Sequence, residues 1–555
     1  MKLLRTLHTI RYLQPRQAFY FFWRRVIGLR AVNMAARELP ARTALQWPVR
    51  NHADDSLTEQ PLTFHFLNHS ESFATDIDWC PQQCNRLWRY NLHYFAYLHA
   101  DVSDSSKARL IDDWIGNNPQ GSQPAWEPYT ASLRIVNWVQ YFSREGIAAS
   151  DAALQSLFEQ SLWLEKNLEL HILANHYFEN LKALCFAASF FTGGDARRWQ
   201  RYVLRELPLQ LDEQFFEDGG HYERSPQYHA ILLEACLEIY RLAASEGGEW
   251  LQPVQAHLQS VIENGLQFLQ TIVSPQQQIP LLNDSAYAVA PELAQLHNDA
   301  ASLQLALPAD TTAPQASIEY PQSGIYGYRH QQDWFLLDCG DIGPAYQPGH
   351  THCDFLSYEL MVAGQLLITD TGVCEYEPGP MRHHVRSTAA HNTVTVDGAE
   401  QSEIWGEFRV ARRAQKQFAT LEQHPARWQF SGGFRGFPAL GWLQHQRDVG
   451  LELSPQGDIQ AVTISDQITG AGTRQLQSYI HLHPAIRPQK RGSEWELYQG
   501  QRLLARLRCT DNSTINEQQS PWCPEFGQQI SRPCLVVSCE TELPASFGYT
   551  ITMVS

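Results

Sequence analysis

Apolar positions divide this chain of 555 residues into a helical half and a half of short strands. Apolar residues recur every three or four positions in 133–142, and the same spacing returns in 154–191 and 228–242. Gly-Gly pairs interrupt this pattern between the apolar stretches. The pattern predicts a succession of helices of about ten to twenty residues, which is typical of an all-α domain.

A polar stretch with two prolines, 308–314, ends the helical pattern and has the composition of a domain linker. After it, short β-rich runs flanked by Gly, Asp, Asn or Pro predict an antiparallel β-sandwich. These runs are 334–337, 366–369, 393–396, 461–464 and 549–554. We therefore expect a lead-in (1–86), a helical domain (87–310) and a β-sandwich (311–555), with the boundary near Asp310.

Composition and charge narrow the class of protein. Hydrophobic residues make up 43% of the chain, which excludes a disordered or low-complexity protein. The formal charge of −17 argues against a nucleic-acid-binding protein, because such a protein needs a basic face. Only 18% of residues are charged, whereas Trp, Tyr and Phe number 16, 22 and 25, a composition that suits sugar binding. The eleven cysteines are scattered and predict no disulfide framework.

The first 42 residues are basic, with nine Lys and Arg and a single acidic residue, Glu38. Their longest apolar run, 18–23, is shorter than the ~7–15-residue core of a secretory signal, so we predict no signal and a cytoplasmic location. No segment reaches the ~20 apolar residues of a membrane span. The segment is expected to form a basic amphipathic helix that packs on the protein, or that contacts an anionic membrane surface or a partner.

The first candidate site is Asn175-His176-Tyr177-Phe178-Glu179-Asn180, inside an otherwise largely apolar helix. On a helix, Asn175 and Glu179 share one face, as do His176 and Asn180. Two interpretations remain open: a structural network between helices, or an amide and an imidazole aimed into a groove where they bind a carboxylate.

The second candidate is the segment 218–229, in which Ser225 and Pro226 have the types preferred at N-cap and N1 of a helix. Tyr228 then lies in the first turn, where the helix dipole favours the phenolate form. The alternative is a tyrosine buried as a helix anchor. The Gly219-Gly220 pair predicts a sharp turn or a close approach of another part of the chain.

The third candidate combines 349–354, 370–372 and 382–393. If 350–354 is extended, His350, His352 and Asp354 project to one face, and Asp370 and His391 could return beside them. A His, Asp, His set suits zinc, although the same residues could form a hydrogen-bonded cluster that stabilises loops.

Together these segments resemble the heparinase II/III-like family of polysaccharide lyases. The match is most specific in 386–398, Arg-Ser-Thr-Ala-Ala-His-Asn-Thr-Val-Thr-Val-Asp-Gly, and continues in Gly219 to Glu223, Ser225 to His229 and Gly349 to Asp354. Asn175-His176 with Asn180 and Asp370-Thr371-Gly372 also match, and a weaker match runs through 88–92, 126–129 and 134–135. The resemblance covers roughly 87–410, in the same order.

The resemblance implies an incomplete α/α toroid followed by an antiparallel β-sandwich, and β-elimination at a uronic acid of an anionic polysaccharide. In this reaction the proton on C5 is removed and a 4,5-unsaturated product forms. By resemblance, Asn175 with His176 neutralises the substrate carboxylate, Tyr228 is the acid and could also be the base, and His350 is the partner base.

The resemblance also places a zinc site at His352, Asp370 and His391, with a role mainly in holding the wall of the cleft. It implies substrate-binding roles for further side chains, for which salt bridges are the alternative. These are Arg134, Glu223, Arg224, Tyr376, Arg382 and Arg386.

Members of the family that act on external polysaccharides usually carry a secretory signal, so a periplasmic location is the alternative. The basic opening of the chain suggests exopolysaccharide or capsule metabolism. Two other functions compete with the lyase. One is a glycoside hydrolase that pairs Glu223 with Asp218 or Glu179. The other is a non-catalytic polysaccharide-binding component of a synthesis complex.

Overall fold

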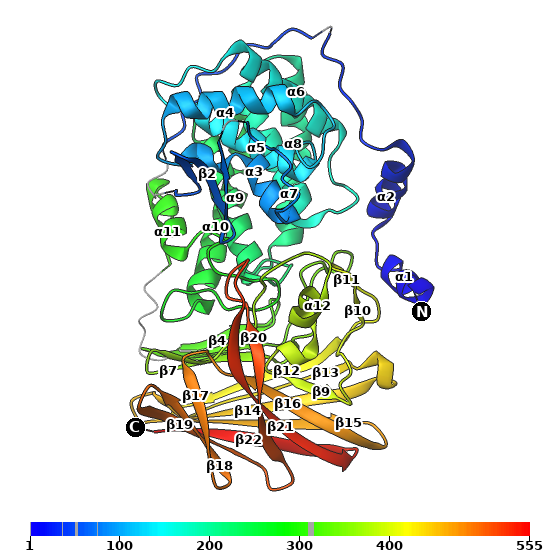
Figure 1. Cartoon of the computed structure of the whole chain (residues 1–555), viewed down its shortest axis with the longest axis vertical. Coiled ribbons are helices and arrows are strands. Elements are labelled where there is room, and N and C mark those ends of the chain that lie inside the picture. Colours follow the sequence, from blue (N-terminus) through cyan, green and yellow to red (C-terminus); the bar gives the residue numbers. More distant parts are fainter. Residues whose placement is uncertain (1, 36, 50–53, 75, 309–315, 555) are drawn as a thin grey trace.

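The computed structural model describes residues 2–35, 37–49, 54–74, 76–308 and 316–554. A helical lobe is followed by a lobe of β-sheets, and the two lobes lie end to end along the long axis of the molecule (Figure 1). This order confirms the predicted fold, an α/α toroid and then an antiparallel β-sandwich. The predicted boundary at Asp310 itself falls outside the described residues.

The helical lobe contains antiparallel helix pairs around an apolar and aromatic core. Its most central helix, α7, is buried along almost its whole length and packs on α5, α8 and α9. Indole rings fill much of the remaining space, including those of Trp88, Trp114, Trp138 and Trp163. The helices are α3 (Arg86–Tyr94), α4 (Asp104–Asn117), α5 (Pro128–Phe142), α6 (Asp151–Lys166), α7 (Ala174–Phe190), α8 (Gly194–Gln214), α9 (Pro226–Ala243), α10 (Gln252–Ile272) and α11 (Leu293–Ser302).

The described residues of the second lobe form three larger antiparallel sheets and one two-stranded sheet. The five-stranded sheet, in the order β4-β5-β6-β7-β8, lies next to the helical lobe. It comprises β4 (Ala316–Tyr320), β5 (Ile325–His330), β6 (Asp333–Asp338), β7 (Tyr358–Val362) and β8 (Gln365–Ile368).

An eight-stranded sheet and a four-stranded sheet complete this lobe, in the orders β12-β13-β14-β15-β22-β19-β18-β17 and β20-β21-β16-β9. Helix α12 (Pro380–Arg386) and the small pair β10 (Ile404–Trp405) and β11 (Arg409–Val410) lie on the side facing the helices (Figure 1). The strands are β9 (Val394–Val396), β12 (Gln415–His424), β13 (Arg427–Gly436), β14 (Leu443–Leu453), β15 (Ile459–Thr469), β16 (Thr473–His481), β17 (Ile486–Arg491), β18 (Glu494–Gln499), β19 (Arg502–Cys509), β20 (Thr514–Trp522), β21 (Ile530–Glu542) and β22 (Ala545–Met553).

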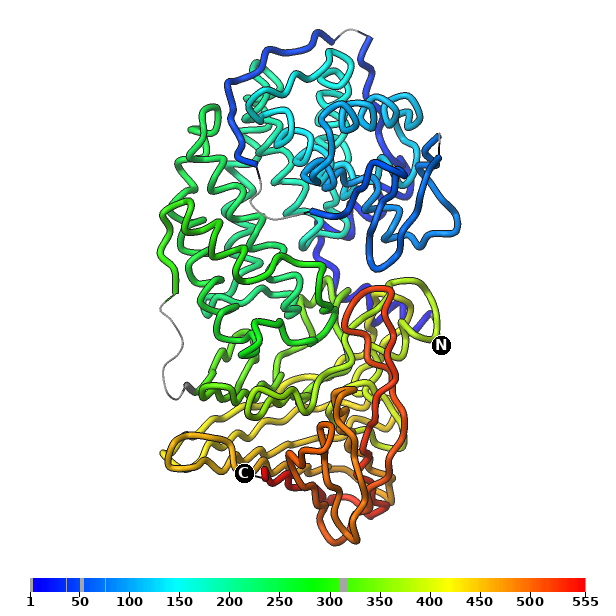
Figure 2. Tube along the Cα trace, turned by 60° about the vertical axis from the view of Figure 1, so that its left-hand side comes forward, coloured from blue at the N-terminus to red at the C-terminus, as the bar shows by residue number. Residues whose placement is uncertain are grey.

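The N-terminal segment begins beside β10 and β11 (Figure 1) and then runs along the helical lobe and over its far end (Figure 2). It contains helices α1 (Lys2–Ile10) and α2 (Pro15–Ile27) and a small sheet of β1 (Leu57–Glu59), β2 (Leu62–Phe66) and β3 (His69–Phe73). No helix of the described residues is long and apolar enough to cross a membrane.

Several local predictions are confirmed. Ser225 caps α9, accepting from the backbone N–H of Tyr228 at 3.3 Å, and Pro226 is its first residue. The predicted close approach at the Gly pair is also present: a Cβ on Gly220 would lie 1.9 Å from Ser323 Oγ of the β lobe. The extended conformation considered for 350–354 is absent, because these residues form an irregular loop.

A buried charge cluster connects the eight-stranded sheet to the loops that face the helical lobe. Asp466 on β15 accepts from Arg447 Nε at 2.7 Å and from His445 Nε2 at 2.8 Å. Arg447 also donates to the carbonyls of Leu356 and Asn392, at 2.7 and 2.6 Å. The cluster thus fixes the two loops that carry the third candidate site.

We predict that Asp466→Asn destabilises the β lobe by roughly 3–5 kcal/mol, because it leaves the buried Arg447 cation without its counter-ion. Scanning calorimetry should show the β-lobe transition at a lower temperature. Asp448→Asn is the matched control, since Asp448 is exposed on the adjacent strand β14. Equal transition temperatures for the two variants would contradict the role assigned to the cluster.

Candidate active site between the two lobes

The site is built around a contact between Tyr228 of the helical lobe and His350 of the β lobe. The two rings stack with their centroids 3.7 Å apart and their planes inclined by 29°. Tyr228 lies in the first turn of α9, and His350 lies in the irregular loop before β7. The lobes therefore supply opposite halves of one site.

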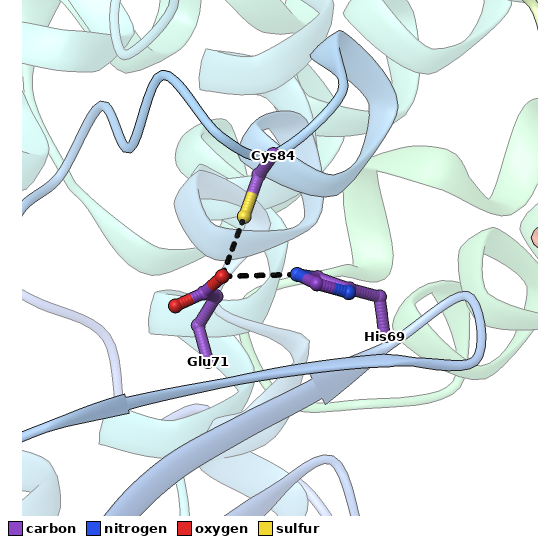
Figure 3. A group of neighbouring side chains, drawn as sticks. All are labelled: His69, Glu71 and Cys84. Carbon is purple, nitrogen blue, oxygen red and sulfur yellow. Dashed lines mark hydrogen bonds and ion pairs between the residues drawn. The ribbon is translucent and has the colours of Figure 1, made fainter.

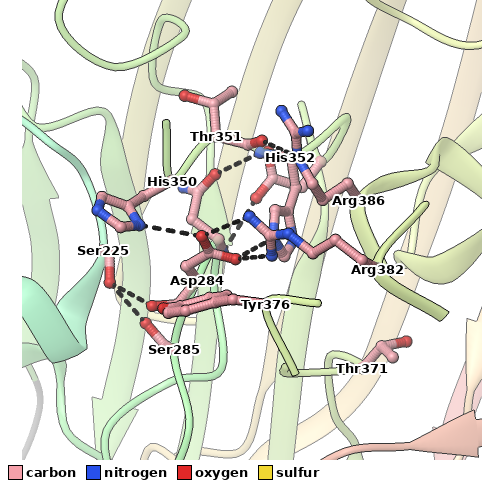
Figure 4. Close-up of polar contacts among 12 residues, drawn as sticks. Ser225, Asp284, Ser285, His350, Thr351, His352, Thr371, Tyr376, Arg382 and Arg386 are labelled. Carbon is pink, nitrogen blue, oxygen red and sulfur yellow. Dashed lines mark hydrogen bonds and ion pairs between the residues drawn. The ribbon is translucent and has the colours of Figure 1, made fainter. Parts of the chain in front are cut away.

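Asp284 lies at the centre of the site and is fully buried. Its carboxylate accepts from His350 Nδ1 at 2.9 Å, from His352 Nε2 at 2.8 Å and from Arg382 Nη2 at 2.8 Å (Figure 4). Burial raises the pKa of a carboxyl group, but Arg382 and the two imidazoles outweigh it and hold the pKa of Asp284 well below its usual range. Asp284 is thus a permanent anion that three side chains share.

The hydrogen bond to Asp284 fixes the orientation of His350. With Nδ1–H donating to the carboxylate, the neutral imidazole has its lone pair on Nε2. Nε2 lies 3.5 Å from Asn175 Nδ2 and 3.6 Å from Glu223 Oε2. This arrangement is that of a general base held by a carboxylate on its far side.

Glu223 holds Asn175 in place at the start of α7. The backbone N–H and the side-chain amide of Asn175 both donate to Glu223 Oε1 at 3.0 Å, and the amide also contacts Oε2 at 3.0 Å. Both residues are buried. Asn175 therefore presents a fixed amide next to His350, and Glu223 orients this amide.

His176 is half-buried on the same edge of α7 and lies over Tyr129, with ring centroids 4.4 Å apart. Its Nδ1 lies 3.1 Å from Glu169 Oε1. Burial opposes the charged form, but Glu169 outweighs it and raises the pKa of His176. Asn180 hydrogen-bonds to Glu169 and to Ser132, so this part of the motif is a structural network, one of the two interpretations the sequence left open.

The phenol of Tyr228 lies 3.3 Å from that of Tyr376, which comes from the loop before α12. Burial raises the pKa of Tyr228 well above its usual value, and Tyr376 raises it further. The sequence predicted a favoured phenolate from the helix dipole. This expectation is wrong because loss of hydration outweighs the dipole, so Tyr228 is a protonated phenol near neutral pH.

The four arginines predicted to bind substrate serve the structure instead. Arg134 is fully buried, stacks on Trp114 and donates to Gln160 and to two backbone carbonyls. Arg382 pairs with Asp284, and Arg386 donates to the carbonyls of Thr351, Gly406 and Glu407. Arg224 donates to the carbonyl of Ser323 across the junction of the lobes. One sequence cannot distinguish such buried arginines from exposed ones.

The buried atoms at His352 and His391 fit a metal ion. Among the described residues, His352 Nδ1 and His391 Nε2 have no hydrogen-bond partner, although both are buried. These two residues and Asp354 can bring three ligand atoms within 4.8 Å of one another. Burial lowers the pKa of His352 to about 3, which keeps its imidazole neutral as a ligand must be.

Asp370, predicted as the carboxylate ligand, lies on the opposite side of His391. Its two oxygens are 2.9 and 3.0 Å from His391 Nδ1, so in the neutral imidazole Nδ1 carries the hydrogen and Nε2 the lone pair, although burial is outweighed by Asp370 and the pKa of His391 is raised. The structure therefore groups Asp354 with the two histidines and places Asp370 behind them. Cys353 donates to the carbonyl of Ser402 and does not belong to the group.

A second group of metal-binding residue types, His69, Glu71 and Cys84, lies on the small N-terminal sheet and in the turn before α3 (Figure 3). Its atoms bond to one another: His69 Nε2 lies 3.0 Å from Glu71 Oε1, and the thiol of Cys84 donates to the same oxygen at 3.6 Å. Burial raises the pKa of Cys84 to about 12, so its sulfur is a protonated thiol. We therefore interpret this group as a hydrogen-bonded network.

Comparison with known proteins identifies the family. The chain matches the family model of the heparinase II/III N-terminus over residues 8–304 and that of the heparinase II/III-like C-terminal region over residues 312–549. The chain belongs to the heparinase II/III family.

The similar proteins found share little sequence identity with this chain. A heparin-sulfate lyase of Pedobacter heparinus is 23% identical over 95% of this chain and 83% of its own length. The FtsZ-localized protein C of Caulobacter vibrioides is 25% identical over 59% of this chain and 55% of its own length. The crystal structure of heparinase III superposes with a TM-score of 0.70 at 15% identity, covering 98% of this chain and 85% of that one, which shows a shared fold.

The sequence motifs identified Asn175, Tyr228, His350 and Tyr376, and the heparinase II/III fold places these four side chains together. The sequence analysis missed Asp284. The only signal for Asp284 was the polar triplet Asn283-Asp284-Ser285 directly after the apolar residues Leu281 and Leu282. A buried strand-like run that ends in polar residues often places them at a site, but no spacing linked this triplet to 349–354.

We predict that Asp284→Asn lowers kcat by at least about a hundredfold with a smaller effect on KM, because His350 loses the anion that fixes its tautomer. Steady-state kinetics on purified protein with an unchanged circular dichroism spectrum would measure this. Asp218→Asn is the control, since Asp218 contacts Ser323 at the junction of the lobes and not the histidines. An unaltered kcat for Asp284→Asn would show that His350 does not depend on this carboxylate.

Proposed function

We propose that this protein is a polysaccharide lyase that cleaves a uronic-acid-containing polysaccharide by β-elimination. The observation that carries the proposal is the contact between a protonated Tyr228 and a His350 whose Nε2 lone pair is fixed by Asp284. These are an acid and a base on one face, next to the amide of Asn175. The family and the named activity of the Pedobacter heparinus relative support the same reaction.

The first requirement of the reaction is to neutralise the carboxylate beside C5, because the proton on C5 is acidic only if the developing enolate is stabilised. Asn175 offers its amide, held by Glu223, and His176 offers an imidazole whose raised pKa favours the cation. Both groups lie at the N-terminal end of α7, where the helix dipole also favours an anion.

Proton transfer then divides between the two stacked rings. His350 Nε2 takes the proton from C5, and the imidazolium is stabilised by Asp284. The Tyr228 phenol donates its proton to the departing oxygen at C4, so the C–O bond breaks as the C4–C5 double bond forms. Because the pKa of Tyr228 is raised, its phenolate is scarcely populated near neutral pH, which favours His350 for the first step.

The glycoside hydrolase alternative lacks its carboxylate pair. Glu179 pairs with Lys182 at 2.8 Å inside the helical lobe, and Asp218 binds Ser323 at the junction of the lobes. Glu223 is bonded to Asn175. None of the three faces another carboxylate across an open space in a way that suits hydrolysis.

We also propose that His352, Asp354 and His391 hold zinc, with Asp370 orienting His391. Such an ion would join the loop after His350 to the segment after α12 and so stabilise the wall of the site. We propose an exopolysaccharide or a capsular polysaccharide as the substrate class, because the N-terminal segment is basic.

We predict that Tyr228→Phe and His350→Ala each lower turnover by at least about two orders of magnitude, the range of a general acid or base. The assay incubates the protein with a panel of uronate polysaccharides and follows the ultraviolet absorbance of the unsaturated chain end. Because the pKa of Tyr228 is raised, its proton stays in place as the pH rises past 7, so kcat/KM should show no loss from this group below the ordinary phenol range.

Tyr240→Phe on the same helix and His257→Ala on α10 are the matched controls and should retain activity. Full elimination by Tyr228→Phe would show that another group is the acid. A wild-type protein that binds the polysaccharides but yields no absorbing chain end would favour a non-catalytic polysaccharide-binding protein. Uptake of labelled water into the product, without the absorbing chain end, would indicate hydrolysis instead.

We predict that elemental analysis of protein purified without chelators finds close to one zinc per chain, and that His391→Ala reduces it by at least about tenfold. Chelation should lower the unfolding temperature of the wild type but not of the variant, because only the wild type loses the ion. A chain without near-stoichiometric metal, and with an unfolding temperature insensitive to chelators, would contradict the zinc site.

A further inference from the structure

Helix α1 packs on the β lobe with its polar side and leaves its apolar side uncovered. Arg5 Nε pairs with Glu403 Oε1 at 3.0 Å, and Thr9 accepts from Trp405 Nε1 at 3.1 Å. The opposite face consists of Leu3, Leu4, Leu7 and Ile10, each more than half exposed. This is the reverse of an amphipathic helix packed on a globular core.

Helix α2 has the same inverted arrangement on the helical lobe. Gln17 is buried and donates to the carbonyls of Ile172 and Tyr346, while Arg16 pairs with Glu206 at 2.9 Å. Apolar and aromatic side chains project away from the protein. Those at the spacing of one helix face are Phe19, Phe22, Trp23 and Val26, and Phe22 and Val26 are 69% and 80% exposed.

These eight residues form what we term the outer face of α1 and α2. They make up half of the large hydrophobic side chains that are exposed among the described residues, although the two helices contain only 22 of the 555 residues. Contiguous exposed apolar surface on a soluble domain marks an interaction site. The helices form an elongated ridge at one side of the molecule (Figure 1).

The charge around the outer face is positive, in a chain whose total charge is −17. Residues 1–30 contain seven Lys and Arg and no Asp or Glu. Arg11, Arg25 and Arg30 are exposed beside the apolar residues. An apolar strip of Leu, Phe and Trp bordered by arginines is the composition of a helix that lies in the interface of an anionic membrane.

We propose that α1 and α2 dock this protein on an anionic lipid bilayer, with the outer face inserted at the level of the headgroups. A second copy of the chain suits the surface less well, because a twofold contact through this face would bring its own arginines together. A bilayer satisfies both features at once, since its acyl region accepts the leucines and phenylalanines and its anionic headgroups pair with the arginines.

The docked orientation would place the edge of the active site near the bilayer. The segment 403–413, on which α1 rests, also carries Phe408, whose ring lies 6.4 Å from that of His350 and 5.5 Å from that of Tyr376. An enzyme held this way meets a polysaccharide where the polymer lies close to the membrane. The docking itself does not depend on the proposed chemistry, so the two can be tested separately.

The test is flotation of the full chain with phosphatidylcholine vesicles that contain about 30% phosphatidylglycerol, against vesicles of phosphatidylcholine alone. We expect flotation with the anionic vesicles only, and its loss as salt is raised. The double variant Phe22→Ser and Val26→Ser should weaken binding by at least about tenfold, and Arg25→Glu by a similar factor. Hydrogen exchange should show protection of peptides from residues 2–30 on the anionic vesicles.

Val49→Ser and Arg427→Glu are matched controls, because they change an exposed apolar and an exposed basic residue elsewhere and should float like the wild type. Absence of flotation with anionic vesicles, or equal flotation with neutral ones, overturns the proposal. So does a mass by light scattering that is a multiple of 63.4 kDa and falls to one chain in the double variant, because the outer face would then be an interface between copies. Lyase assays on the soluble double variant keep the result distinct from the proposed reaction, since none of its substituted residues lies in the site.

Discussion

The buried carboxylate of Asp284 is the interaction on which the arrangement between the two lobes depends. It belongs to a loop that leaves the helical lobe, yet its three partners, His350, His352 and Arg382, all belong to the β lobe. A buried anion needs such partners, because an unpaired charge in this environment is costly. The same pairing orients His350, holds His352 of the group that fits a metal ion, and anchors α12, the helix that follows Tyr376.

This shared anion also explains why His350 and His352, which belong to one short motif, have different surroundings. His350 and His352 are two residues apart and bond to different oxygens of the same carboxylate. His350 bonds through Nδ1 and His352 through Nε2, so a different ring nitrogen is left free in each. His350 has its free nitrogen beside Asn175, whereas the free nitrogen of His352 is enclosed with His391 and Asp354. The nitrogen of the proposed base and the nitrogen that fits a metal ion are therefore separated by one carboxylate and not by distance along the chain.

The fold was predictable from the sequence because its signals are local. Helical spacing, the Ser225-Pro226 cap and the Gly219-Gly220 pair each act over a few residues, and the structure has these elements where they were expected. The site was only partly predictable, since its motifs identified Tyr228, His350 and Asn175 but contained nothing about Asp284, about 60 residues from either ring. The buried arginines show the same limit: Arg134 and Arg386 have the residue type of anion ligands, and only their burial among backbone carbonyls shows that they hold the structure.

The N-terminal arm has a mechanical consequence for the molecule. Arg5 of α1 is held by Glu403 on the β lobe, and Arg16 of α2 is held by Glu206 on the helical lobe. Only four residues, 11–14, connect the two helices, and the five steps from Ile10 to Pro15 span at most about 18 Å. As long as both anchors hold, the arm is a tether of fixed maximum length between the lobes, which limits how far Tyr228 and His350 can move apart.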